Sequence, residues 1–237
     1  MMKNCISQKI IKLGQDVIKD FFLTLRNKLG LAPRPVLNSV PVLIDFTEKQ
    51  SAYVSQVTLF GYIKTRAGTS WPKLFEDDTY LISLRTARSH FFAACVADLS
   101  IFIAARMFTG ARLSADQAVR LAVHIAESVL LNHQQDDIDP SAFVDIVHRT
   151  RQRAEVMAWE EAATTALAFA SSAEAFMKWA PVTDEFKALD EEIMRNSLHL
   201  RWIGIRRDIK ETLNVEQLLP DLAALAAPSD RSGNSGA

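Results

Sequence analysis

The sequence predicts an all-α protein: a helical bundle of about six to eight helices with an N-terminal amphipathic helix and an extended proline-rich strap. Three observations predict this class. Apolar residues recur at spacings of three and four along almost the whole chain, the period of helices with one buried face. Only eight glycines and eight prolines interrupt the 237 residues. A chain of this length can also bury a substantial core.

Residues 1–29 are predicted to form an amphipathic arm helix that ends at Gly30. Lysines interrupt its apolar residues and no small-residue cleavage site follows, which disfavours a signal peptide. Its wide apolar face must be buried somewhere. Two destinations stay open, the fold or a dimer on the one hand, and a membrane surface or partner on the other. The residues expected to face the membrane or partner are Ile10, Val17, Phe21 and Phe22.

Residues 30–46 are predicted to be an extended strap, because three prolines in "LAPRPVLNSVPVLIDF" oppose a continuous helix. A helical domain is expected to follow over residues 47–227. The pattern Thr47-Glu48-Lys49-Gln50 resembles a capping box, so the first helix should run from Thr47 to about Arg66. The stretch "AGTSWPKLFEDD" should break the chain after it.

Later boundaries follow from similar signals. One helix is expected from about Asp78 to Gly110, and a second capping box at Ser114 opens a helix to about Asn132. Pro140 fits the first position of the next helix, after Asp139. Residues 141–179 read as helical with a break near Ser171-Ser172. Further helices are expected from Thr183 to about Leu213 and then to Pro228, and residues 228–237 read as a disordered tail.

The run "FFAACVADLSIFIAARMF", residues 91–108, is the most apolar part of the chain. A membrane-spanning helix needs about 20 predominantly apolar residues. Here Asp98 lies in the middle of the run and Arg106 follows eight residues later, both costly inside a bilayer. The run is therefore predicted to be a core helix, in which Asp98 needs a hydrogen-bonding or ionic partner.

The sequence lacks the motifs of several enzyme classes. No Gly-x-Ser-x-Gly, no phosphate-binding glycine loop and no Glu-x-x-His pattern occurs. The nearest metal-ligand spacings are Asp145 with His148 and His124 with Glu127, which are interpreted as polar helix faces. Cys5 and Cys95 form no ligand or disulfide pattern, which is typical of a cytoplasmic protein. We expect no metal and no cofactor.

The helix starting at Thr183 has an acidic first half and a basic second half. A stripe of five residues in its second half is the candidate site for an anion or a partner: Arg195, His199, Trp202, Arg206 and Lys210. A basic stripe with a central tryptophan suits an anionic ligand or a lipid head group. The alternative is that acidic neighbours within the fold neutralise it. The net charge of −1 makes nucleic acid an unexpected partner.

The segments "PRPVLNSVPVLIDFTEKQSAYVSQVTLFGYIKTRAGTSWPKLFEDD" and "APVTDEFKALDEEIMRNSLHLRW" resemble a group of small, little-characterised alphaproteobacterial proteins. The resemblance covers most of the chain. Some members carry the label "esterase", so the resemblance implies a hydrolase. It brings no motif to compare, and no catalytic residue is carried over.

The sequence therefore favours a non-enzymatic helical interaction or scaffold protein in the cytoplasm, peripheral at the inner membrane surface where its arm helix binds. Its expected partner is another protein or a second copy of the chain. The alternative is a small hydrolase or a metal-dependent helical enzyme whose substrate the sequence does not identify.

Overall fold

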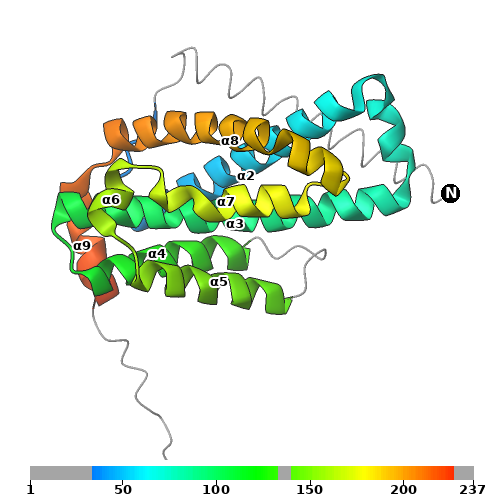
Figure 1. Ribbon diagram of the computed structural model, residues 1–237. Helices are drawn as coiled ribbons and strands as arrows, with labels where there is room; N and C mark the ends of the chain where they lie inside the picture. Colours follow the sequence, from blue (N-terminus) through cyan, green and yellow to red (C-terminus); the bar gives the residue numbers. More distant parts are fainter. Residues whose placement is uncertain (1–33, 133–139, 227–237) are drawn as a thin grey trace, which may run out of the picture. The chain divides into compact units, whose positions relative to one another are not determined.

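The computed structural model describes residues 34–132 and 140–226 (Figure 1). Contacts divide the chain into two units, residues 1–36 and residues 37–237, and the described helices all lie in the second. This described part contains eight α-helices, two 3-10 helices and no strand, so the all-α prediction is confirmed. In chain order they are α2 (Val40–Ala67), η1 (Gly68–Glu76), α3 (Asp78–Ala111), α4 (Ala115–Asn132), α5 (Pro140–Glu155), α6 (Trp159–Thr164), η2 (Leu167–Phe169), α7 (Ala170–Trp179), α8 (Asp184–Thr212) and α9 (Val215–Ala226).

Helix α3 is the central element of this unit. It runs between α2 and α7 on one side and α4 and α5 on the other, and it also contacts α6 and α9 (Figure 1). Among the described helices, α3 is long and apolar enough to cross a membrane, but 83% of its most apolar window is buried inside the fold. Packing against its neighbours therefore accounts for the apolar run, as predicted for a core helix.

Two helix starts show how the local sequence sets the boundaries. The carboxylate of Asp77 accepts hydrogen bonds from the amides of Thr79 and Tyr80 at the start of α3. At the start of α4, Ser114 Oγ accepts from the Gln117 amide, while Gln117 Oε1 accepts from the Ser114 amide at 2.8 Å. This reciprocal pair is the capping box that the sequence predicted, and it satisfies amides that have no partner within the helix.

The predicted strap is wrong over residues 40–46, because α2 begins at Val40 and not at Thr47. Pro41 lies in the first turn of α2, where a missing amide hydrogen costs nothing. The free amide of Val40 donates to Asp221 of α9 at 2.8 Å, so a distant side chain caps this helix. Thr47 is buried within α2, and its hydroxyl donates back to the Leu43 carbonyl instead of forming a capping box.

One break was predicted in residues 141–179, near Ser171-Ser172, and the structure has two, one of which ends at Ala170. The helix stops after Glu155 and again after Thr164, whereas Ser171 and Ser172 lie in the first turn of α7. The segments after these two helix ends contain neither glycine nor proline, the residues that most clearly mark the end of a helix in a sequence. A tertiary contact sets the start of α7, since the amides of Ser171 and Ser172 bind a carboxylate of α3 described below.

Helices α8 and α9 close the unit. The Thr212 carbonyl at the end of α8 accepts a hydrogen bond from the Leu37 amide, and the Leu37 carbonyl accepts one from Asn214, forming one isolated bridge. Both helices lie close to their predicted places, although Pro220 falls inside α9.

Candidate interaction surface

Helix α8 packs on α2 and α7 with one face only. The side chains of this inner face are all buried, and they recur at spacings of three and four: Asp190, Met194, Leu198, Trp202, Ile205 and Ile209. This periodicity is that of an ordinary surface helix with a single buried stripe. The opposite face would therefore be expected to be polar.

The outer face of α8 instead carries large apolar side chains. Five of them are exposed: Phe186 (46%), Leu189 (75%), Ile193 (65%), Leu200 (68%) and Ile203 (47%). Their spacings of three, four, seven and three residues match the a and d positions of a heptad, with Asn196 at the d position between Ile193 and Leu200. We call these five residues the α8 seam. It extends for about 25 Å along the helix, at 1.5 Å per residue.

Charged residues line one edge of the α8 seam. Glu185, Glu192, His199 and Arg206 follow one another at intervals of seven, so they occupy equivalent places beside the seam. The first two are acidic and the last two are basic. Glu185, Glu192 and His199 are exposed, and Arg206 is partly buried. The edge thus changes sign near the middle of the helix.

The structure divides the five candidate residues predicted on this helix. Trp202 belongs to the inner face: it is 2% exposed, and its Nε1–H donates to Ser172 Oγ at 3.2 Å. Its ring also packs 4.6 Å from that of Phe169. Trp202 is therefore a core residue in this structure, so it is separated from the exposed basic residues around it.

The other four candidate residues lie on the outer side or at its margin. Arg195 is exposed and pairs with Glu191 one turn earlier at 2.8 Å, while His199 and Lys210 are exposed. Arg206 donates to the Thr164 carbonyl at 2.6 Å, and its guanidinium lies 5.6 Å from the Phe102 ring centre. Burial lowers the pKa of Arg206. The predicted stripe thus mixes one core residue, one anchored arginine and three surface residues.

An ionic cluster joins α8 to α2 at the start of the α8 seam. Arg66 donates two hydrogen bonds to Asp190 through Nε and Nη2, and Tyr62 donates one to Asp190 Oδ2 at 3.0 Å. The hydrogen bonds from Arg66 hold the pKa of Asp190 below its ordinary value. Burial and the bond to Asp190 raise the pKa of Tyr62 to about 12. The Arg66 guanidinium also lies 4.9 Å from the ring centre of Phe186, the first seam residue.

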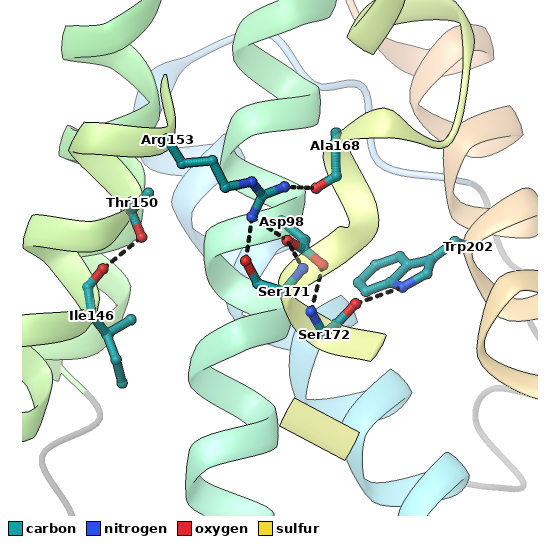
Figure 2. A network of polar contacts seen from close by, with 8 residues as sticks. All are labelled: Asp98, Ile146, Thr150, Arg153, Ala168, Ser171, Ser172 and Trp202. Carbon is teal, nitrogen blue, oxygen red and sulfur yellow. Dashed lines mark hydrogen bonds and ion pairs between the residues drawn. The ribbon is translucent and has the colours of Figure 1, made fainter. Parts of the chain in front are cut away.

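A second polar network lies in the core around Asp98, which the sequence predicted would need a partner. The fully buried carboxylate accepts a hydrogen bond from Arg153 Nη1 at 2.6 Å, and from the amides of Ser171 at 3.2 Å and Ser172 at 2.8 Å (Figure 2). Arg153 also donates to Ser171 Oγ and to the Ala168 carbonyl. The expected partner is confirmed, and the network joins α3, α5, α7 and, through Trp202, α8.

The arrangement around Asp98 is that of a structural cap. A carboxylate at the start of a helix satisfies its free amides and interacts favourably with its dipole. Burial raises the pKa of Asp98, and the charge of Arg153 and the bonds from Ser172 offset part of that rise. Ser172 Oγ is fully buried and accepts from Trp202, so this serine is occupied in packing and not placed as a nucleophile.

Metal-ligating residues are not grouped in the described part of the chain. Within residues 34–132 and 140–226, no group of three or more histidine, cysteine or acidic residues is placed to hold a metal ion. A recess between α4 and α9 is lined by Leu113, Gln117, Arg120, Leu121, Leu222 and Leu225. Its volume of about 10 Å³ has room for about one water molecule.

The candidates on the arm helix, Ile10, Val17, Phe21 and Phe22, lie outside the described residues. The α8 seam was missed by sequence reasoning, although its heptad spacing is present in "FKALDEEIMRNSLHLRWI". The buried apolar residues of the inner face overlap the seam in the sequence, so the apolar pattern alone does not separate the two faces. The predicted site was therefore based on the basic residues of this helix. No family model, no curated protein and no solved structure matches this chain.

Proposed function

We propose that this chain is a non-enzymatic helical interaction protein whose docking surface is the α8 seam. One observation carries the proposal: five large apolar side chains are exposed in heptad register on the face of α8 opposite its buried face. Single exposed apolar residues are common and need no explanation. An apolar stripe in heptad register is different, because it is the pattern by which one helix recognises another.

The interior of the described unit supports the same function. Its two main charged clusters, around Asp98 and Asp190, are each engaged in joining helices, as the hydrogen bonds from Arg153 and Arg66 show. These groups stabilise the fold and are not left poised for proton transfer or nucleophilic attack. No observation on the described residues favours the hydrolase alternative. Ser70, which lies two residues after Gly68 in "AGTSWPKLFEDD", is an exposed residue of the 3-10 helix η1 and is not part of a strand-to-helix turn, where hydrolases hold a nucleophilic serine.

The docking surface can be tested by chemical labelling in the native host. A Cys5→Ser chain carrying Ile193→Cys should be protected from a maleimide in intact cells, because a partner covers the α8 seam. The matched control is Ile82→Cys, on α3, which is exposed to a similar extent at 56% and lies outside the seam. It should react rapidly, as an exposed thiol does. Equal, fast labelling at both positions would contradict the proposal.

The cytoplasmic, membrane-peripheral part of the proposal rests on the predicted arm helix, residues 1–29. Six basic and two acidic residues occur within residues 1–33. Lysines near an anionic surface contribute about 1 kcal/mol each, so binding to anionic vesicles should weaken as salt rises. Sedimentation with vesicles measures this binding. A full-length Phe21→Asp, Phe22→Asp variant should lose it, and wild-type protein that ignores vesicles would remove the membrane part alone.

A further inference from the structure

We propose that the partner bound by the α8 seam is a second copy of the chain, with the two α8 helices antiparallel about a twofold axis. This inference rests on the proposed function, because it names the partner of the same surface. Three features of α8 carry it: the register of the seam, the sign change along its edge, and the exposure of the five seam residues together with Glu185, Glu192 and His199 in the described unit.

The register of the seam fits itself when one helix is reversed. With the axis between residues 194 and 195, every a position meets a d position of the second copy, as antiparallel helix pairs require. Phe186 then packs on Ile203, Leu189 on Leu200, and Ile193 on Asn196. Four of the five seam residues thus oppose another apolar side chain, and Ile193 opposes the polar side chain of Asn196 close to the axis. Such self-complementarity is the requirement for a twofold interface.

The charges beside the seam select the antiparallel orientation. In this register Glu192 lies beside His199 of the second copy, and Glu185 lies beside Arg206. Twofold symmetry repeats each pair, so every glutamate on this edge faces a basic side chain of the second copy. A parallel pair would instead bring the two acidic halves of this edge together, and likewise the two basic halves. Like charges at these positions disfavour a pairing, and opposite charges set its direction.

Asn196 gives the seam a single polar position close to the axis. A polar residue within an apolar seam reduces the affinity, but it restricts the register and the number of helices that associate. Its side chain is exposed in the described unit. The seam therefore combines a small apolar area with two features that select one arrangement, the charges along its edge and Asn196. This combination suits a dimer of moderate affinity and not an open-ended assembly.

The first experiment measures the mass of the full-length protein in solution. Light scattering coupled to size exclusion should give a dimer for the wild type at micromolar concentration. Ile193→Lys places two charges near the axis and should weaken dimerisation by a factor of about 100 or more. Ile82→Lys, at an exposed position on α3, should leave the dimer intact. Unchanged circular dichroism and a cooperative melt would show that all three chains are folded, and Ile193→Lys should melt at a lower temperature because it loses the stabilisation from association.

The second experiment tests orientation by exchanging charges. His199→Glu places a carboxylate beside Glu192 of the second copy at two symmetric places, so the dimer should weaken about tenfold at low salt. Glu192→Lys should weaken it less. The double variant Glu192→Lys, His199→Glu restores opposite charges and should recover wild-type affinity or exceed it. Failure of the double variant to recover would overturn the antiparallel register, since a parallel pair separates these positions.

The outcomes separate this inference from the proposed function. A wild-type monomer would overturn the second-copy inference, whatever covers the seam. If the thiol of the Ile193→Cys variant were nevertheless protected in cells but reactive in the pure monomer, a different protein would be the partner and the proposed function would stand. If that thiol were protected in the pure monomer, another part of the same chain would cover the seam. If it reacted freely in both settings, both proposals would be overturned.

Discussion

Asp98 on α3 and Asp190 on α8 are both buried carboxylates paired with an arginine, yet they stabilise the fold in different ways. Asp98 is fully buried and also caps the start of α7, so its charge interacts with two backbone amides as well as Arg153. Asp190 lies at the junction of α8 and α2, where Arg66 remains partly exposed. One carboxylate organises the centre of the unit, whereas the other fastens a surface helix.

The two environments shift the carboxyl pKa values in opposite directions. Loss of water around Asp98 raises its pKa more than its partners lower it, whereas hydrogen bonds from Arg66 lower the pKa of Asp190. The difference shows that an arginine partner does not by itself set the sign of a shift. The balance between lost hydration and gained hydrogen bonds sets it, and that balance depends on depth within the fold.

The largest effect is expected for Asp98→Ala. Removing this carboxylate leaves Arg153 and the amides of Ser171 and Ser172 without their acceptor in the core. Breaking a buried pair in this way typically costs about 3–5 kcal/mol of the free energy of unfolding. Urea unfolding followed by circular dichroism measures the loss. Asp190→Ala is the matched control and should lower stability less, because water can solvate Arg66. Equal losses would contradict the distinction between the two sites.

A smaller effect is expected for Trp202→Phe, which removes the hydrogen bond to Ser172 Oγ and part of a fully buried ring. We expect a loss of about 1–3 kcal/mol in the free energy of unfolding, from one lost bond and a small cavity. Lys210→Ala changes an exposed position of α8 outside the seam and its charged edge, and is the control. If Trp202→Phe kept full stability but no longer bound an anionic ligand, Trp202 would be a binding residue, as the sequence predicted, and not a core residue.

These buried contacts show what could be predicted from the sequence. The fold class, the core role of residues 91–108 and the capping box at Ser114 depend on periodicity and local hydrogen bonds, and they are confirmed. That Asp98 needs a partner follows from burial alone. Its identity does not, because Arg153 lies 55 residues away and only the folded chain brings the two together.

The boundaries that failed have the same cause. The start of α2 is capped by Asp221, and the start of α7 is capped by Asp98, so neither cap is local in sequence. On α8, two apolar sets of helical period overlap, and the sequence does not say which one faces inward. Packing on α2 and α7 decides it, placing Trp202 inside and the α8 seam outside.

The raised pKa of Asp98 predicts an unusual dependence of stability on pH. The Asp98 carboxyl holds its proton more tightly in the folded state than in the unfolded state, where it titrates at about pH 4. As the pH rises from there through the folded pKa, wild-type stability should therefore fall relative to Asp98→Asn, which does not titrate. Urea unfolding of both chains across a pH series measures this difference. A difference that grew with pH would mean that Arg153 outweighs the loss of hydration.

The smallest effect is expected at Asp190, and its sign is opposite. Because its folded pKa lies below the ordinary value, the unfolded state binds the proton more tightly. Its stabilising contribution is complete above about pH 4 and is lost as the pH falls through the folded pKa. The stability of wild type relative to Asp190→Asn should therefore decline on acidification. Tyr62→Phe keeps Arg66, the largest cause of the shift, so it should keep most of this decline. A pH-independent difference would show that Arg66 does not stabilise the charged carboxylate. Asp98 and Asp190 would then differ only in how deeply they are buried, and not in the direction of their pKa shifts.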